Sequence, residues 1–184
     1  FSNKRHWHFI HDSLIELRKE LKNLGQSLII RTGSVIDIFN ELSTQFDIVS
    51  IYAHEETGNR WTYDRDLNVK HWCIEKNILL KEYPTNGIVR NLKNRDDWSK
   101  IRNLRLKENL IPNPLSLVPI KGIKIGSIPK KDSPIFKNDF MGKVQKGGRI
   151  EALKIIQSFI NDRGKNYLFN ISKPGISEKT CSRI

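Results

Sequence analysis

Cysteine is scarce in this chain, and so are long apolar runs. Its 184 residues include two cysteines, Cys73 and Cys181, which cannot form the framework of bridges that holds small secreted domains together. So few thiols fit a reducing compartment, and we expect a cytoplasmic location, or a nuclear or organellar one in a eukaryote. No stretch has enough consecutive apolar residues to span a bilayer, and we expect neither a signal peptide nor a membrane partner.

Three motifs that identify common enzyme classes are also missing. The sequence contains no G-x-S-x-G, no G-x-x-x-x-G-K-[ST] and no G-x-G-x-x-G. It therefore gives no sign of a hydrolase nucleophile elbow, a P-loop or a dinucleotide-binding turn. The hydrophobic content of 38% and the charged content of 28% are typical of a soluble globular protein with one sizeable core.

Positive charge dominates the chain but is unevenly distributed. The formal net charge is +12, of which residues 1–110 carry +3 and residues 111–184 carry +9. A basic second part indicates a polyanionic partner, either nucleic acid or the phosphates of a nucleotide cofactor. A solvated, lysine-rich linker explains the same charge equally well, so the composition leaves both interpretations open.

The spacing of apolar residues predicts helices and strands in alternation over the first 110 residues. Apolar residues three and four positions apart predict a helix from Trp7 to Leu24, which Gly25 ends. The following patterns predict two further helices and three short apolar strands: helices at 35–42, with Ser34 as its cap, and 62–76, and strands at 27–31, 47–53 and 78–83.

This order of elements defines a fold class. Wholly apolar strands that alternate with amphipathic helices are typical of a parallel sheet covered on both faces. We therefore predict an α/β protein with a Rossmann-like parallel sheet and helices on both faces. Because the order begins with a helix, we expect that the first strand of the sheet is lacking. The chain also starts at Phe1 rather than methionine, so we expect a piece of a longer protein.

The composition changes beyond a further helix predicted at 96–108. Five of the seven prolines lie within residues 111–146, where the apolar residues have no sustained period, so an extended linker is predicted there. A new helical pattern begins after Gly147 and Gly148, whereas the stretch from Tyr167 onward is loop-like. We divide the chain accordingly into residues 1–110, 111–146 and 147–184.

The strand predicted at 47–53 runs into a very polar segment, HEETGNRWTYDRD, at residues 54–66. In parallel α/β sheets, ligands bind beyond the carboxyl ends of the strands. His54, Glu55 and Glu56 lie at such an end and are therefore candidate ligand-binding residues.

A purely structural explanation of this segment is open as well. Thr57 or Asn59 can organise a turn, while the neighbouring carboxylates face water or pair with Arg60 and Arg65. Asp66 lies early in a helix, whose positive end it complements, and we expect it to form an ion pair within the molecule. Other basic residues can bind phosphate or belong to a solvated helix face: Arg90, Lys93, Arg95, Lys100, Arg102 and Arg105.

A zinc site is the third interpretation of this segment. The H-x-E pattern of zinc deaminases occurs at residues 54–56, but its P-C-x-x-C partner is missing because the two cysteines are far apart. The H-E-x-x-H pattern of metalloproteases fails because Gly58 occupies the place of its second histidine. We therefore predict no metal site.

Several motifs occur in one order along nearly the whole chain. They are R-H-W-x-F-I-x-D-S-L at residues 5–14, H-E-E-T-G at 54–58, R-D-x-x-V-x-x-W at 65–72 and Y-P-T-N-G-I-V-R at 83–90, then Gly147-Gly148 with Ala152-Leu153 and Phe159, and finally C-S-R-I at 181–184. In this order they resemble the DNA photolyase/cryptochrome family. The resemblance implies that 1–110 is an antenna-type α/β domain, 111–146 an interdomain linker, and 147–184 the start of an FAD-binding helical domain.

The resemblance also implies a function for the full-length protein. Such a relative uses blue light and FAD to split pyrimidine dimers in DNA, with the flavin held against a flipped-out lesion, and we expect a monomer whose basic arm lies near the DNA backbone. This chain lacks most of the helical domain, so we expect no repair by the chain alone. A cryptochrome-like photoreceptor without repair activity, and a non-catalytic α/β remnant, are the alternatives.

Site residues follow from the resemblance only where the motifs match. Tyr167 lies where the family has a tyrosine near the flavin, although a tyrosine that packs on a helix end is the alternative. Ser182 is expected to donate its hydroxyl to the FAD phosphates and Arg183 to add positive charge, while Cys181 replaces a common threonine and is a poorer donor.

The polar segment at 54–58 corresponds to a loop near the antenna chromophore of relatives. That chromophore is often a folate, in some relatives a flavin or lumazine, and in others absent. A carboxylate accepts two adjacent N–H groups of a pterin, so Glu56 is the first candidate, followed by Glu55 and His54.

Overall fold

The computed structural model describes residues 3–137 and 144–180, so Cys181, Ser182 and Arg183 lie outside the described residues. The chain forms two compact units. The first, unit 1, comprises residues 1–30 and 114–184, and the second, unit 2, comprises residues 31–113. The division at 110/111 and 146/147 inferred from the sequence stays a prediction.

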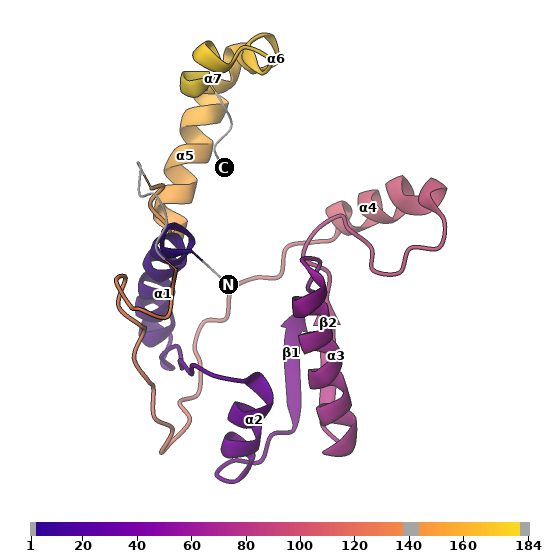
Figure 1. Ribbon diagram of the computed structural model, residues 1–184, viewed down its shortest axis with the longest axis vertical. Helices are drawn as coiled ribbons and strands as arrows, with labels where there is room; N and C mark the ends of the chain where they lie inside the picture. Colours follow the sequence, from indigo (N-terminus) through magenta and orange to yellow (C-terminus); the bar gives the residue numbers. More distant parts are fainter. Residues whose placement is uncertain (1–2, 138–143, 181–184) are drawn as a thin grey trace. The chain divides into compact units, whose positions relative to one another are not determined.

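Unit 2 contains a parallel two-stranded sheet with helices (Figure 1). Strands β1 (Ser50–His54) and β2 (Leu79–Tyr83) pair in parallel, with Ser50 opposite Leu79 and His54 opposite Tyr83. The predicted α/β class with a parallel sheet is thereby confirmed. The helices of unit 2 are α2 (Val35–Ser43), α3 (Arg60–Glu75), the 3-10 turn η1 (Arg95–Asp97) and α4 (Trp98–Lys107).

The most buried side chains of unit 2 lie on α3. Cys73 is 1% exposed and Trp72 is 5% exposed. The Trp72 Nε1–H donates to Asn40 Oδ1 at 2.8 Å, and its ring lies 5.3 Å from the ring of Phe39. Because a buried indole needs a partner for its N–H, this hydrogen bond allows Trp72 to join α2 to α3.

Unit 1 is built on α1 (Lys4–Asn23), and residues 114–137 of the predicted linker lie beside it without regular helix or strand. The backbone N–H of Leu117 donates to the Leu24 carbonyl at 2.6 Å, and the Ile120 N–H donates to Gln26 Oε1 at 2.7 Å. Further along, the Trp7 Nε1–H donates to the Lys130 carbonyl at 3.1 Å. Hydrogen bonds therefore hold this stretch both to α1 and to the residues that directly follow the helix.

Two glycines of unit 1 are required by their surroundings. Gly25 follows α1 with a φ of +114°, a conformation that favours glycine, so the predicted end of the first helix is confirmed. Gly147 precedes α5 (Arg149–Asn161), and a Cβ there would collide with the Phe9 carbonyl oxygen. Only glycine lets these two backbone segments approach so closely.

Two local predictions are wrong, and a third is correct only in part. Residues 27–31 are extended but form no strand, since a strand needs a paired neighbour, and the Ile30 N–H instead donates to Ile125 O at 2.8 Å. Ser34 is the N-cap residue of α2 but its side chain makes no capping hydrogen bond. The stretch from Tyr167, predicted to be loop-like, forms two short helices after the turn η2 (Arg163–Asn166): α6 (Tyr167–Asn170) and α7 (Pro174–Thr180).

A contact between the two short helices and a proline at the start of the second accompany the last difference. Asn170 is 6% exposed and its Nδ2 donates to Thr180 Oγ1 at 3.3 Å, which ties α6 to α7. Pro174 occupies the first position of α7, where proline is favoured. Among the described residues, no helix is both long and apolar enough to cross a membrane.

Candidate functional site

The two strands of unit 2 end side by side, and the segments that follow them form one rim. We define the carboxyl-end rim as residues 54–59 and 83–90. The Glu55 N–H donates to the Tyr83 carbonyl at 2.8 Å, and the Thr85 hydroxyl donates to the Glu55 carbonyl at 3.1 Å. Because the strands are parallel, their carboxyl ends bring these two segments together.

A cluster of charges lies under this rim. The Arg90 guanidinium donates through Nη1 to Glu82 Oε1 at 2.8 Å and through Nη2 to Asp66 Oδ2. The other oxygen of Asp66 accepts from Arg65 Nη2 at 3.2 Å, which confirms that Asp66 forms an ion pair within the molecule. The side chains of Arg90 and Asp66 are 17% and 15% exposed, so solvent screens their pairing only partly.

The same cluster holds the backbone of Glu56. Its N–H donates to Asp66 Oδ2 at 3.2 Å, and its carbonyl accepts from Arg90 Nε at 2.8 Å. Burial alone lowers the pKa of Arg90, but the hydrogen bonds with Glu82 and Asp66 outweigh it and raise that pKa above its ordinary value. Arg90 therefore stays positively charged and holds the loop through its hydrogen bond to the Glu56 carbonyl.

Helix α4 packs on the other segment of the rim. The Trp98 Nε1–H donates to the Gly87 carbonyl at 2.7 Å. Arg105 Nη1 donates to the carbonyls of Asn86 at 3.0 Å and Ile88 at 2.7 Å. Arg105 is one of the basic residues predicted either to bind phosphate or to belong to a solvated helix face. In the structure it instead donates hydrogen bonds that close the turn at residues 86–88.

The Glu55 carboxylate has one oxygen without a hydrogen-bond partner. Glu55 Oε2 is buried and accepts from no donor among the described residues. The nearest cation is Arg105, whose Nη2 lies 3.9 Å away, beyond hydrogen-bond range. A buried carboxylate oxygen in this state can accept an N–H from a ligand, because leaving it unpaired is costly.

The neighbouring candidates lie on the same rim. His54 is the last residue of β1 and its side chain is exposed, whereas Glu56 is half-buried. The structure thus brings His54, Glu55 and Glu56 together, with an acceptor set that fits a ring edge rich in N–H groups. Their roles in binding an antenna stay predictions.

The structural explanation of the polar segment is partly realised. Asn59 Oδ1 accepts from the Thr62 N–H at 3.1 Å and so caps α3. Arg60 pairs with Asp64 at 2.7 Å, one helical turn away. The pairing of Glu55 and Glu56 with Arg60 and Arg65, one of the interpretations of the sequence, is therefore wrong, since each arginine has an aspartate on its own helix.

Tyr167 belongs to unit 1. It is the first residue of α6, and its ring meets the ring of Phe159 edge-on at 5.4 Å. This contact matches the structural alternative, a tyrosine that packs on a helix end. Its place near a flavin, and the roles of Cys181, Ser182 and Arg183, stay predictions.

The sequence does not indicate the joint role of Arg90, at the end of the rim, and Asp66, which lies outside the rim on α3. It predicts an ion pair for Asp66, but the hold that both residues have on the Glu56 backbone joins positions 24 residues apart. The available signal was the position of each one, Arg90 shortly after a strand and Asp66 early in the preceding helix.

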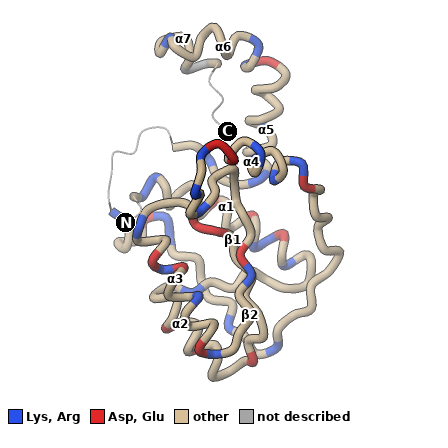
Figure 2. The backbone as a smooth tube through the Cα atoms, turned by 90° about the vertical axis from the view of Figure 1, so that its right-hand side faces the viewer, with Lys and Arg blue, Asp and Glu red and all other residues tan. Residues whose placement is uncertain are grey.

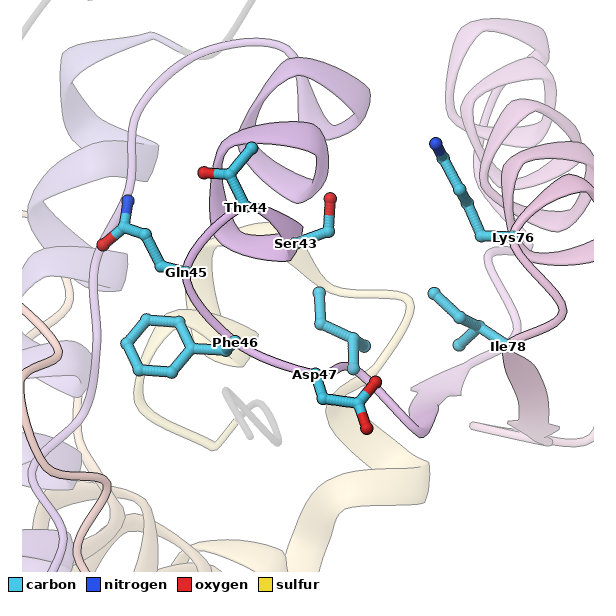
Figure 3. A pocket seen from close by; sticks show the side chains of 8 residues that line it. Ser43, Thr44, Gln45, Phe46, Asp47, Lys76 and Ile78 are labelled. Carbon is cyan, nitrogen blue, oxygen red and sulfur yellow. The ribbon is translucent and has the colours of Figure 1, made fainter.

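A hollow lies at the opposite end of the sheet from the rim, where β1 and β2 begin (Figure 3). It has a volume of about 440 Å³ and is lined by residues 43–48 with Lys76 and Ile78. Asp47 and Lys76 give it one charge of each sign. Ligands of parallel α/β sheets bind at the other end of the strands, so the carboxyl-end rim remains the candidate site.

Clusters of metal-ligating side chains are a further kind of candidate site. Figure 2 shows the Lys, Arg, Asp and Glu positions along the backbone. Residues 3–137 and 144–180 contain no group of three His, Cys, Asp or Glu side chains able to hold a metal ion.

Comparison with known proteins identifies the family. The family model for DNA photolyase matches residues 1–96, which include the rim and the Arg90–Asp66 pair. The chain therefore belongs to the DNA photolyase family. The comparison with curated protein sequences gives no match.

Solved structures of this family share the fold. A bacterial class III photolyase from Agrobacterium tumefaciens superimposes with a TM-score of 0.66 at 14% identity, over 91% of this chain and 38% of its own. A cryptochrome from Synechocystis sp. PCC6803 gives 0.66 at 18% identity, over 92% of this chain and 38% of its own. The chain thus spans 38% of the length of these two structures. Family membership includes both photolyases and cryptochromes.

Proposed function

We propose that this chain is the antenna-domain part of a light-driven DNA photolyase that repairs pyrimidine dimers with FAD. The observation that carries the proposal is the combination of a DNA photolyase match over residues 1–96 with a rim in which the buried Glu55 Oε2 has no hydrogen-bond partner among the described residues. Bound FAD would supply the light-driven transfer of one electron. We further propose that the full-length protein is a monomer in a reducing compartment, which is the cytoplasm or, in a eukaryote, the nucleus or an organelle.

The residues of this chain would contribute to light harvesting rather than to the repair step. Glu55 and Glu56 would accept N–H groups from the edge of a pterin, and His54 lies beside them at the end of β1. A folate antenna suits this acceptor set, and a flavin or lumazine also has a ring edge with an N–H group. Tyr167, Ser182 and Arg183 would contact FAD together with parts of the longer protein.

The test of the repair function uses the full-length protein. Purified protein is mixed with DNA that contains cyclobutane pyrimidine dimers, illuminated with blue light, and the dimers are counted, with a dark sample as control. We expect dimers to disappear only in the light. If a preparation that contains flavin leaves the dimers intact, the photolyase assignment is lost.

The second candidate is a cryptochrome-like photoreceptor. It is supported by the Synechocystis cryptochrome, which this chain matches with the same TM-score as the photolyase and nearly the same coverage, 92% against 91% of this chain. A light-dependent change in the flavin spectrum without loss of dimers would favour this candidate.

The antenna role is tested separately, by titrating the full-length protein with methenyltetrahydrofolate and with FMN. Glu55→Gln is expected to weaken binding of the true antenna, because an amide replaces one acceptor oxygen by a donor. Glu41→Gln, an exposed glutamate on α2, serves as control and should bind as the unchanged protein does.

A further inference from the structure

The main chain at Glu55 and Glu56 is held at every polar atom. The Glu55 N–H and carbonyl bond to Tyr83 and Thr85, and the Glu56 N–H and carbonyl bond to Asp66 and Arg90. Loop backbone normally satisfies part of this demand with water. Four protein partners therefore fix the direction in which the two carboxylates leave the backbone.

Two of these four partners are the charged side chains of Arg90 and Asp66, and both form several hydrogen bonds inside the molecule. Arg90 uses Nε on the Glu56 carbonyl, Nη1 on Glu82 and Nη2 on Asp66, and its guanidinium lies 5.7 Å from the ring centre of Tyr63. Asp66 accepts from Glu56, Arg90 and Arg65. Because both charges are paired within the molecule, neither group suits direct ligand binding.

We infer that Arg90 and Asp66 are positioning residues, which hold the Glu55–Glu56 backbone so that the Glu55 carboxylate faces the N–H groups of a chromophore. The inference rests on the proposed antenna role of the rim. A planar guanidinium suits this task because it donates in several fixed directions at once. Residues that orient a ligand-binding group act on affinity by limiting its movement.

The experiment measures two quantities on the full-length protein. The first is the dissociation constant for methenyltetrahydrofolate and, in a separate titration, for FMN. The second is hydrogen exchange of the Glu55 and Glu56 amides without ligand. The variants are Arg90→Gln, Arg90→Lys and Asp66→Asn, and the matched control is Asp64→Asn, which removes an exposed ion pair from the same helix.

The inference predicts a coupled pattern of changes. Arg90→Gln is expected to raise the dissociation constant about tenfold, the equivalent of one charge-assisted hydrogen bond, and to speed exchange at Glu56. Arg90→Lys should recover part of the affinity, because it keeps the charge but not the fork. Asp64→Asn should change neither quantity. Amides in the middle of α3 should keep their protection in every variant, which separates positioning from general loss of stability.

Each remaining outcome has a defined meaning. If Arg90→Gln does not fold, Asp66→Asn takes its place, because an asparagine oxygen can still accept a hydrogen bond while the charge is removed. If the unchanged protein binds a chromophore and the variants bind it equally well despite faster exchange, the positioning role is wrong and the antenna role stands. If the unchanged protein binds neither probe, the antenna role fails and the positioning role with it, whereas the dimer-repair assay is unaffected.

Discussion

At the scale of single residues, burial controls the chemistry of the Cys73 thiol. Cys73 is 1% exposed on α3, and burial raises its pKa above the ordinary value, which keeps the reactive thiolate rare. We expect a Cys181→Ser variant, which leaves Cys73 as its one thiol, to react slowly with a disulfide reagent when folded and rapidly in denaturant. Fast reaction of the folded protein, followed by absorbance, would contradict the buried position.

Asp12 in unit 1 gives a prediction for acid stability. Its Oδ1 lies 2.6 Å from Lys131 Nζ. Burial alone raises the pKa of Asp12, but the hydrogen bond and charge of Lys131, with a backbone hydrogen bond from Gly147, outweigh it and lower that pKa. Since the folded pKa lies below the unfolded value of about 3.9, the stabilisation is complete above that value and is lost as the pH falls through the folded pKa.

The measurement compares the free energies of unfolding of the unchanged protein and Asp12→Asn, obtained from urea transitions between pH 7 and pH 3. The pair is partly exposed, at 37% for Lys131 and 22% for Asp12, so we expect a difference of about 1 kcal/mol or less at pH 7, shrinking toward pH 3. Lys131→Met should shrink the difference at pH 7. A difference that grows on acidification would mean that Asp12 is not stabilised in its charged form.

At the scale of elements, the start of α5 depends on side chains from α1. The Ile150 N–H donates to Glu16 Oε1 at 2.9 Å, and the Gly148 N–H donates to Ser13 Oγ at 3.0 Å. Free N–H groups at a helix start need such acceptors, and a carboxylate also complements the positive end of the helix.

We therefore expect Glu16→Ala to lower the free energy of unfolding by about 1 kcal/mol. Hydrogen exchange at Ile150 should accelerate in the same variant. Glu20→Ala, at an exposed position on the same helix, is the control and should have a much smaller effect. Equal losses in the two variants would show that helix propensity, and not capping of α5, is responsible.

The elements differ in how far local sequence determines them. Apolar spacing predicts the helix from Lys4 to Asn23 and the strands β1 and β2. One apolar face is enough to identify such a helix, and one short apolar run is enough to identify such a strand. Residues 27–31 have an equally apolar sequence, yet a strand also needs a partner. The helices α6 and α7 were missed because contacts such as that between Asn170 and Thr180 decide them.

The candidate site, too, could be predicted from the sequence only in part. His54, Glu55 and Glu56 could be found because they directly follow a predicted strand, and ligand sites gather at such ends. The arrangement beneath them could not, since Asp66, Glu82 and Arg90 come from three separate segments and meet only after the parallel pairing is fixed. Long-range ion pairs have no local periodicity from which to predict them.

At the scale of the whole molecule, the uneven charge yields a test on DNA. Residues 111–184 carry +9 of the +12 net charge, and the exposed lysines Lys121 and Lys124 lie in the extended stretch beside α1. If this stretch lies near the DNA backbone, each of these lysines displaces a counterion on binding. We expect the double variant Lys121→Gln/Lys124→Gln of the full-length protein to reduce the slope of log affinity against log salt concentration by up to about 2.

The control for this test is Lys70→Gln/Lys76→Gln, which removes the exposed Lys70 of α3 and the exposed Lys76 directly after that helix, and thereby the same net charge. Affinity for a short duplex is measured by fluorescence anisotropy from low to moderate salt. A general effect of net charge would change both variants alike, because long-range attraction depends on the summed field, whereas local phosphate contacts would change only the slope of the linker variant. An unchanged slope in the linker variant would leave the basic stretch as a solvated connection between domains, with DNA contacts made elsewhere in the full-length protein.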